Sequence, residues 1–225
     1  MTDVPEAGPE AHDAERAAWR DVTRARLAHR RAGLDACALA EAGRRVADAL
    51  APMLEALARG SASPPVVAGY AAVRGELEVD TALALARKLG AVTALPVTSG
   101  TAMRFVPFDA DTPMRVGRFG IRVPEPSPDG PDARDLGPRE LDLVLVPLLG
   151  FDARLDRLGM GGGFYDRAFE HRRRDAGPDP DPRPRLVGIA HAFQRLDDVR
   201  AMPWDVPLDA VVTERGTFEP QRPAG

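Results

Sequence analysis

The chain has 225 residues, of which 44% are hydrophobic and 28% are charged, and its formal net charge is −4. This balance is typical of soluble globular proteins rather than disordered or fibrous ones, and a nucleic-acid-binding domain would need a basic excess to neutralise phosphates. The length is that of one large α/β domain, which buries enough surface to form a proper core.

The cysteine content and the N-terminal segment indicate where such a chain is expected to reside. The single cysteine, Cys37, has no cysteine with which to form an intrachain disulfide or a paired metal site, which favours a reducing compartment. Residues 1–10 contain acids and prolines where a signal peptide needs a basic start and an apolar run. No stretch approaches the roughly 20 apolar residues of a membrane span. We therefore expect a cytoplasmic protein with no membrane partner.

The N-terminal half predicts two helices followed by an alternation of strands and helices. Residues 1–14 have the composition of a tail, and residues 14–59 predict two helices that break near Gly33-Leu34-Asp35. The alternation begins with three shorter elements: a strand at 66–70, a helix at 81–89 and a strand at 92–96.

The C-terminal half contains the strongest strand signal of the chain. Prolines interrupt residues 103–138, so only short strands such as Arg104–Pro107 are expected there. Leu141–Pro147, with the sequence LDLVLVP, predicts a central strand that is buried on both faces. The remaining elements are a helix from about Tyr165 to Arg174, a surface loop at 175–184, and strands at 185–190 and 210–213.

This order of elements predicts a single three-layer α/β/α domain with a mostly parallel, Rossmann-like central sheet. We expect the domain to span residues 15–216, between an N-terminal tail at 1–14 and a C-terminal tail at 217–225.

A glycine cluster between the central strand and the following helix is the main candidate for a binding site. In the sequence RLGMGGGFYD, residues 157–166, glycines permit positive φ, and their amides can bind an anion. Arg157 could bind phosphate and Asp166 could bind a metal, as a Mg-ATP site requires. The spacing matches neither a Walker loop nor a dinucleotide fingerprint. A tight strand-to-helix turn with no ligand remains an alternative.

Three other features are candidates for the same site. Arg16, Arg20 and Arg24 stack on one helix face, which either is solvated or reaches a nucleotide. Asp205 is either a turn former or a second acid. Glu76 follows the carboxyl end of a predicted strand, the usual ligand edge of an open α/β sheet.

At Phe151-Asp152 and the following RLGMGGGFYDR, the sequence resembles the 5-formyltetrahydrofolate cyclo-ligase family, whose signature joins an LVLVP-type strand, an FD pair and a glycine-rich YD motif. The resemblance covers about residues 15–215. Further matching positions are Arg16 and Arg20, Tyr70 to Glu78 with its Y-x-x-x-x-G-E pattern, Met103-Arg104-Phe105, Pro124-Glu125-Pro126, Trp204-Asp205 and Val211-Val212-Thr213. One position departs from the pattern, because Leu155 stands where the family usually has glycine.

The resemblance implies an enzyme that uses ATP and Mg²⁺ to convert 5-formyltetrahydrofolate into 5,10-methenyltetrahydrofolate, as a monomer or homodimer. ATP would phosphorylate the formyl oxygen, N10 would attack the activated carbon, and phosphate would leave. Arg157 and Tyr165 are the implied catalytic residues, and Asp166 and Asp205 the implied magnesium ligands. The implied ATP-binding residues are Arg16, Arg20, Arg157, Leu158, Gly159, Met160, Gly161, Gly162, Gly163, Phe164 and Tyr165. The implied folate-binding residues are Glu76, Met160, Gly161, Gly162, Gly163, Phe164 and Tyr165.

Two alternatives remain open at this point. A paralogue of the same fold could bind folate or nucleotide without turnover, and Leu155 is the feature in its favour. A sugar-phosphate or coenzyme-A-type enzyme could share the architecture, since a fold does not determine a function.

Overall fold

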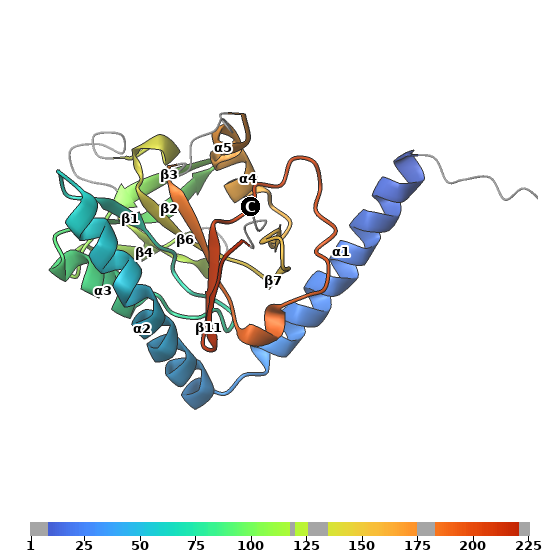
Figure 1. Cartoon of the computed structure of the whole chain (residues 1–225), viewed down its shortest axis with the longest axis horizontal. Helices are drawn as coiled ribbons and strands as arrows, with labels where there is room; N and C mark the ends of the chain where they lie inside the picture. Colours follow the sequence, from blue (N-terminus) through green and yellow to red (C-terminus); the bar gives the residue numbers. More distant parts are fainter. Residues whose placement is uncertain (1–8, 118–119, 126–134, 175–182, 221–225) are drawn as a thin grey trace, which may run out of the picture.

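The computed structural model describes residues 9–117, 120–125, 135–174 and 183–220, and its centre is a seven-stranded mixed sheet (Figure 1). The strand order is β11-β10-β9-β6-β1-β2-β3, in which the five inner strands run parallel and β3 and β11 are antiparallel edges. The strands of this sheet are β1 (Val66–Ala68), β2 (Val92–Ser99), β3 (Ala102–Pro107), β6 (Leu143–Pro147), β9 (Arg185–Ile189), β10 (Ala210–Thr213) and β11 (Gly216–Phe218).

Helices and two small ribbons complete the fold. The helices are α1 (Pro9–Ala32), α2 (Ala36–Gly60), α3 (Asp80–Lys88), α4 (Phe164–Ala168) and α5 (Glu170–Arg174), with 3₁₀ turns η2 (Pro138–Glu140) and η3 (Ala192–Gln194). The ribbons pair β4 (Met114–Val116) with β5 (Arg122–Pro124), and β7 (Gly150–Phe151) with β8 (Arg157–Leu158). Asp35 separates the two long helices and caps α2, because its carboxylate accepts a hydrogen bond from the Ala38 amide at 2.8 Å.

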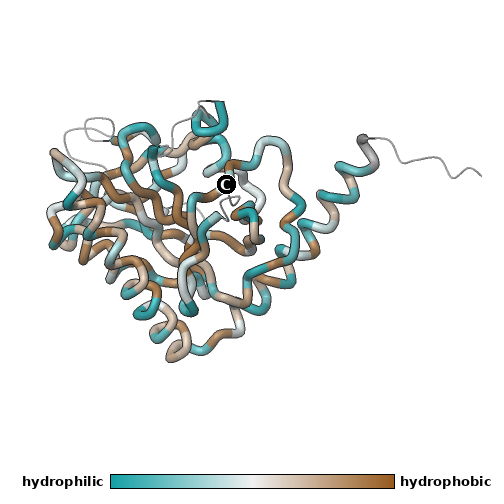
Figure 2. Tube along the Cα trace, in the orientation of Figure 1, coloured by the Kyte–Doolittle hydropathy of each residue, from teal (hydrophilic) through white to brown (hydrophobic). Residues whose placement is uncertain are grey.

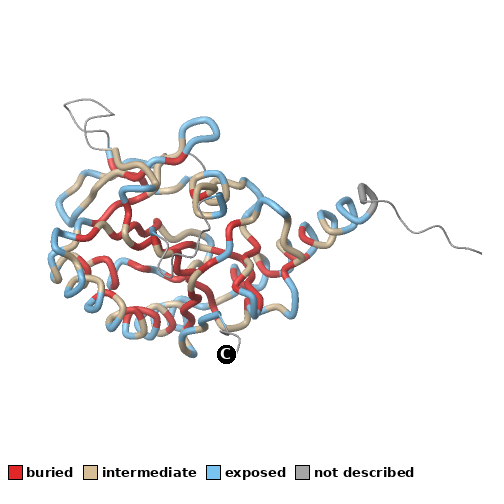
Figure 3. Tube along the Cα trace, turned by 45° about the horizontal axis from the view of Figure 1, so that its top comes forward, coloured by how far each residue is buried: buried red, intermediate tan, exposed pale blue. Residues whose placement is uncertain are grey.

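The sheet has an apolar cluster on each face, as a three-layer fold requires. Along β6, Leu143 and Leu145 pack with α2 and α3, whereas Val144 and Val146 pack with residues of α4 on the opposite face. Figure 2 shows apolar residues concentrated in the sheet, and Figure 3 shows the same strands buried. The prediction of a mostly parallel α/β domain with a central strand at 141–147 is confirmed.

Three expectations about element boundaries were wrong. Residues 9–14 belong to α1 rather than to a tail, since Glu and Ala favour helices and Pro9 is tolerated at a first helical position. The helix expected at 165–174 is divided at Phe169, whose ring is fully buried in the core 6.0 Å from that of Phe105. The sheet continues past residue 216, because β11 pairs with β10 through the two-residue turn Glu214-Arg215.

Most of the loop expected at 175–184 lies outside the described residues. Within the described part of the chain, no helix is long and apolar enough to cross a membrane.

Candidate active site

The segment that leads into the glycine-rich loop is a tight turn organised by a buried carboxylate. Asp152, 1% exposed, accepts hydrogen bonds from the backbone amides of Arg154 at 2.9 Å, Asp156 at 3.2 Å and Val199 at 3.0 Å. Leu155 in this turn has a φ of 64°, in the left-handed region that glycine reaches without strain. Its side chain is nevertheless buried in the core. The turn therefore combines a strained backbone position with a well-packed leucine.

The loop itself has the backbone geometry that its glycines predict. It runs from β8 to α4, and Gly161 and Gly163 have φ values of 95° and 62°. Met160 and Gly161 are exposed, so their backbone is accessible to a ligand. Helix α4 is short, so the loop amides rather than a long helix dipole would provide most of the attraction for an anion.

Arg157 and Asp166 form a largely buried ion pair next to this loop. Arg157 Nη2 donates to Asp166 Oδ1 at 2.6 Å, and the Arg157 guanidinium lies 5.8 Å from the centre of the Tyr165 ring. Arg157 Nε is buried and has no hydrogen-bond partner within the described residues. A buried donor of this kind is costly unless an acceptor binds to it, and a phosphate oxygen would be a suitable one.

The arginine face of α1 points toward this site rather than toward solvent. Arg20, 5% exposed, donates to Asp205 Oδ2 at 2.7 Å. Arg16 Nη1 lies 3.4 Å from the Ala201 carbonyl oxygen, and Arg24 Nε donates to the Gly159 carbonyl oxygen at 2.9 Å. Arg16, Arg20 and Arg24 thus lie on one face of α1, as the sequence predicts. Their side chains connect α1 to residues 201–205 and to the glycine loop at Gly159.

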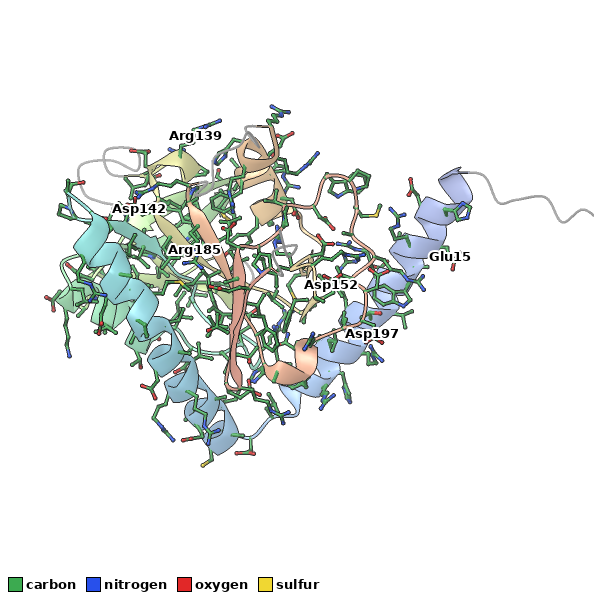
Figure 4. All side chains as sticks on the ribbon, viewed as in Figure 1. Glu15, Arg139, Asp142, Asp152, Arg185 and Asp197 are labelled. Carbon is green, nitrogen blue, oxygen red and sulfur yellow. The ribbon has the colours of Figure 1, made fainter. Side chains whose placement is uncertain are left out.

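Beside Arg16 lies an open crevice of about 460 Å³, lined in part by Arg154, Asp156 and Arg200. Figure 4 labels Glu15, another lining residue, on the part of α1 that extends away from the sheet. The crevice is therefore bordered by arginines from three separate segments, although acids also line it.

The two predicted acids are brought together by the turn at 202–206. Asp166 Oδ1 accepts from the Val206 amide at 3.1 Å, and Asp205 Oδ2 accepts from the Met202 amide at 3.0 Å. Asp205 is therefore a turn former that also pairs with Arg20. Mg²⁺ commonly binds one or two carboxylates together with substrate phosphates. Within the described residues, no group of three or more His, Cys, Asp or Glu side chains could hold a metal.

Glu76 lies in a second cluster, in the connection between β1 and α3. Its carboxylate accepts from the Val73 amide at 3.1 Å and lies 3.4 Å from Arg31 Nη2. Burial raises the pKa of Glu76, and the positive charge of Arg31 opposes this rise. Burial also raises the pKa of Tyr165, an effect that the Glu76 carboxylate reinforces and Arg157 opposes. Tyr165 therefore lies within electrostatic reach of both clusters, and its phenol is neutral at physiological pH.

One arginine near the site, Arg31, had no assigned role in the sequence. Its position follows from helical spacing, because residues 20, 23, 27 and 31 form the buried stripe of α1. The stripe predicts that Arg31 faces inward, but its partner Glu76 is 45 positions away and no local pattern links them.

The chain is similar to known proteins in family, sequence and structure. A model of the 5-formyltetrahydrofolate cyclo-ligase family matches residues 16–214. The 5-formyltetrahydrofolate cyclo-ligase of Escherichia coli (strain K12) is 31% identical over 174 residues, covering 73% of this chain and 89% of the relative. The solved structure of Aquifex aeolicus 5,10-methenyltetrahydrofolate synthetase is similar with a TM-score of 0.69 at 24% identity, covering 92% of this chain and 95% of that one. A Mycoplasma pneumoniae 5,10-methenyltetrahydrofolate synthetase gives a TM-score of 0.61 at 22% identity, covering 87% and 98%.

Proposed function

The chain belongs to the 5-formyltetrahydrofolate cyclo-ligase family, and we propose that its glycine-rich loop and the arginines of α1 bind ATP beside the folate. It is a 5-formyltetrahydrofolate cyclo-ligase, and membership of the family implies that it uses ATP. This assignment decides against a sugar-phosphate or coenzyme-A-type enzyme and against a paralogue without turnover. The assignment of individual residues, the metal and the cytoplasmic location are proposals.

The buried Arg157–Asp166 pair beside the glycine loop is the observation that carries the proposed ATP site. Arg157 would bind the phosphates through the N–H donors of its planar guanidinium, including Nε, which lacks a protein acceptor. Leu158, Gly162 and Phe164 complete the loop whose backbone follows the phosphates, and Arg16 and Arg20 would add positive charge from α1. Phosphoryl transfer depends mainly on such positioning and charge neutralisation.

Asp166 and Asp205 fit a magnesium ion that is shared with the ATP phosphates. In the structure each acid is paired with an arginine, Asp166 with Arg157 and Asp205 with Arg20. Both arginines would move their hydrogen bonds to phosphate oxygens when ATP binds, which would leave both carboxylates to the cation. The ion would supply further neutralisation of phosphate charge.

On the folate side, Glu76 and Tyr165 would orient the substrate against the loop. A formyl oxygen is a poor leaving group, and its phosphorylation turns it into a good one. Attack by N10 on the formyl carbon would then form the new C–N bond, release phosphate and free the N10 proton. Because Tyr165 is neutral, it can donate a hydrogen bond to the substrate but cannot act as a base at physiological pH.

Absorbance at the methenyl-folate band is the direct test. The purified protein is mixed with 5-formyltetrahydrofolate, Mg²⁺ and ATP, and an ATP-dependent rise is expected relative to an ATP-free control. Folate binding by calorimetry without such a rise would contradict the proposal.

The magnesium assignment has its own test in the same assay. Asp166→Asn should raise the apparent magnesium requirement, because an amide oxygen is a weaker ligand than a carboxylate. Asp209→Asn is a matched control, since Asp209 is paired with Arg172 elsewhere in the fold. An unchanged magnesium titration for Asp166→Asn would remove this residue as a ligand.

A further inference from the structure

Arg31 is a buried arginine that the proposed ATP site does not use. It lies in the last turn of α1 with only 2% of its surface exposed. Its Nε donates to the Arg74 carbonyl oxygen at 3.1 Å, and its Nη1 donates to the Leu148 carbonyl oxygen at 3.3 Å. Its Nη2 lies 3.4 Å from Glu76 Oε1 and makes no hydrogen bond within the described residues. The guanidinium thus joins α1 to the connection that carries Glu76.

The turn that presents Glu76 is packed directly against the end of α1. Arg74 and Gly75 have φ values of 51° and 76°, and a Cβ on Gly75 would lie 2.5 Å from the Arg31 carbonyl oxygen. Glu76 uses Oε2 to accept from the Val73 amide within this turn. Its Oε1 is therefore the oxygen on the side of Arg31.

A purely structural role would not require a positive charge at this place. Gln194 Nε2 already donates to the carbonyl oxygens of Leu148 at 2.9 Å and Leu149 at 2.8 Å, so the segment after β6 is held without Arg31. What Gln194 cannot supply is a cation beside Glu76, whose side chain is only 9% exposed. A buried carboxylate without a cation would favour its neutral form.

We propose that Arg31 is a positioning residue, whose guanidinium favours the charged form of the Glu76 carboxylate against the effect of burial and orients it to accept hydrogen bonds from N–H groups of the folate. This inference rests on the proposed folate-binding role of Glu76. It assigns Arg31 a role in folate affinity rather than in ATP affinity, although the proposed ATP-binding residues of α1 and of the glycine loop belong to the same active site.

Among the groups around Glu76, Arg31 is the cation that forms an ion pair with it and the one with the largest electrostatic effect on its pKa. Burial lowers the pKa of His191, whose Nε2 lies 3.0 Å from the Gly75 carbonyl oxygen, and raises the pKa values of Tyr70 and Tyr165. Those three groups are neutral at physiological pH. The titratable and charged groups that interact with Glu76 are Arg31 from α1, Arg74 and Tyr70 from its own connection, and Tyr165 from α4. His191, from the segment after β9, contacts the adjacent residue Gly75.

The experiment compares KM values for folate and for ATP in Arg31→Gln, Arg31→Lys and Glu76→Gln. A hydrogen bond to a charged group contributes about 1.5–3 kcal/mol, so Arg31→Gln should raise the folate KM roughly 10- to 100-fold. The ATP KM should stay within about 2-fold, and Arg31→Lys should recover part of the loss because it keeps the charge. Arg30→Gln removes the neighbouring, exposed arginine and should leave the folate KM unchanged.

Two further readouts separate positioning from packing. In a Glu76→Gln background, Arg31→Gln should change the folate KM by no more than about 2-fold, since the carboxylate on which it acts is gone. In the wild-type background, loss of the cation should move the acid limb of kcat/KM for folate to higher pH, and Arg31→Lys should leave the limb near that of the wild type.

The outcomes distinguish this inference from the proposed function. A folate KM that rises in Glu76→Gln but not in Arg31→Gln would overturn the inference alone. An unchanged folate KM in Glu76→Gln would overturn the folate role of Glu76 and the inference with it. If Arg31→Gln fails to fold, the pair Arg31→Met and Glu76→Gln, which leaves no lone buried charge, is compared with Glu76→Gln alone. Equal folate KM values in those two proteins support the inference, and a further large rise contradicts it.

Discussion

Arg157 is the side chain on which the proposed ATP site depends most. It is 4% exposed, pairs with Asp166 at 2.6 Å and retains a buried Nε without a protein acceptor. Such a group is held in place before the ligand arrives, so it need not be ordered during phosphoryl transfer. Its catalytic contribution should therefore exceed that of an exposed arginine.

We expect Arg157→Ala to lower kcat by roughly 10³-fold or more, the range in which a well-placed arginine contributes to phosphoryl transfer. Arg157→Lys should retain more activity than Arg157→Ala but less than the wild type, because lysine keeps the positive charge but lacks the planar, bidentate donors of the guanidinium. Initial rates in the absorbance assay, with thermal unfolding to verify the fold, provide the measurement. Near-normal turnover in Arg157→Ala would refute the assignment.

Leu155 shows a conflict between backbone strain and burial at a single residue. The left-handed conformation costs a non-glycine residue about 1–2 kcal/mol, whereas loss of a buried leucine side chain costs about 2–5 kcal/mol. Burial therefore outweighs the strain. This explains how leucine can occupy a turn position where the sequence pattern led us to expect glycine.

Replacement of Leu155 should give an unusual order of stabilities. Both Leu155→Gly and Leu155→Ala should be less stable than the wild type, but the alanine variant should be the less stable of the two by about 1 kcal/mol, since it keeps a Cβ at positive φ. At Leu158, which is equally buried but in β8, the order should be reversed. Urea unfolding of the four variants gives the comparison, and the usual order at both positions would contradict the strain.

At the scale of elements, the sequence predicted the order of strands and helices well where hydrophobic patterns are strong. The LVLVP run identified the central strand because a strand buried on both faces must be continuously apolar. Local patterns did not predict that the long helix expected at 165–174 would break at Phe169, whose side chain is buried in the core. The glycine loop and both acids were found from local sequence, whereas the contacts that bring Asp166 and Asp205 together depend on the turn at 202–206.

The glycine loop allows a matched test of its backbone geometry. Gly161 has a φ of 95°, whereas Gly159 lies outside the left-handed region and an added Cβ would make only an ordinary contact at 3.8 Å. We expect Gly161→Ala to destabilise the folded protein by about 1–2 kcal/mol and Gly159→Ala to change stability by less than about 1 kcal/mol. Urea unfolding without ligand measures both. Equal effects of the two substitutions would mean that positive φ is not what requires glycine at residue 161.

At the scale of the whole molecule, the site lies where three regions distant in sequence meet. Helix α1, the segment from β7 to α4 and the turn at 202–206 are joined by Arg20–Asp205, Arg24–Gly159 and Asp166–Val206 contacts. The sequence named most of these residues but not their partners, because no pairing rule connects residues that lie 40 to 185 positions apart. Arginine contacts thus join α1 to the rest of the site, together with the apolar cluster in which Leu27 packs against Leu158 and Val199.

The dependence of stability on pH tests the buried charge of this assembly. Burial holds the pKa of Glu76 above its ordinary value of 4.5, so the folded protein binds this proton more tightly than the unfolded chain. The resulting stabilisation is fully present below about pH 4.5 and is lost as the pH rises through the raised pKa.

Glutamine does not titrate, and subtraction of the Glu76→Gln variant cancels the other carboxylates. The unfolding free energy of the wild type minus that of Glu76→Gln should therefore fall as the pH rises above 4.5 and then level off. Urea unfolding of both proteins at matched ionic strength measures this difference. A difference that increases with pH would mean that the attraction of Arg31 outweighs burial, and that the carboxylate is stabilised in its charged form before any ligand binds.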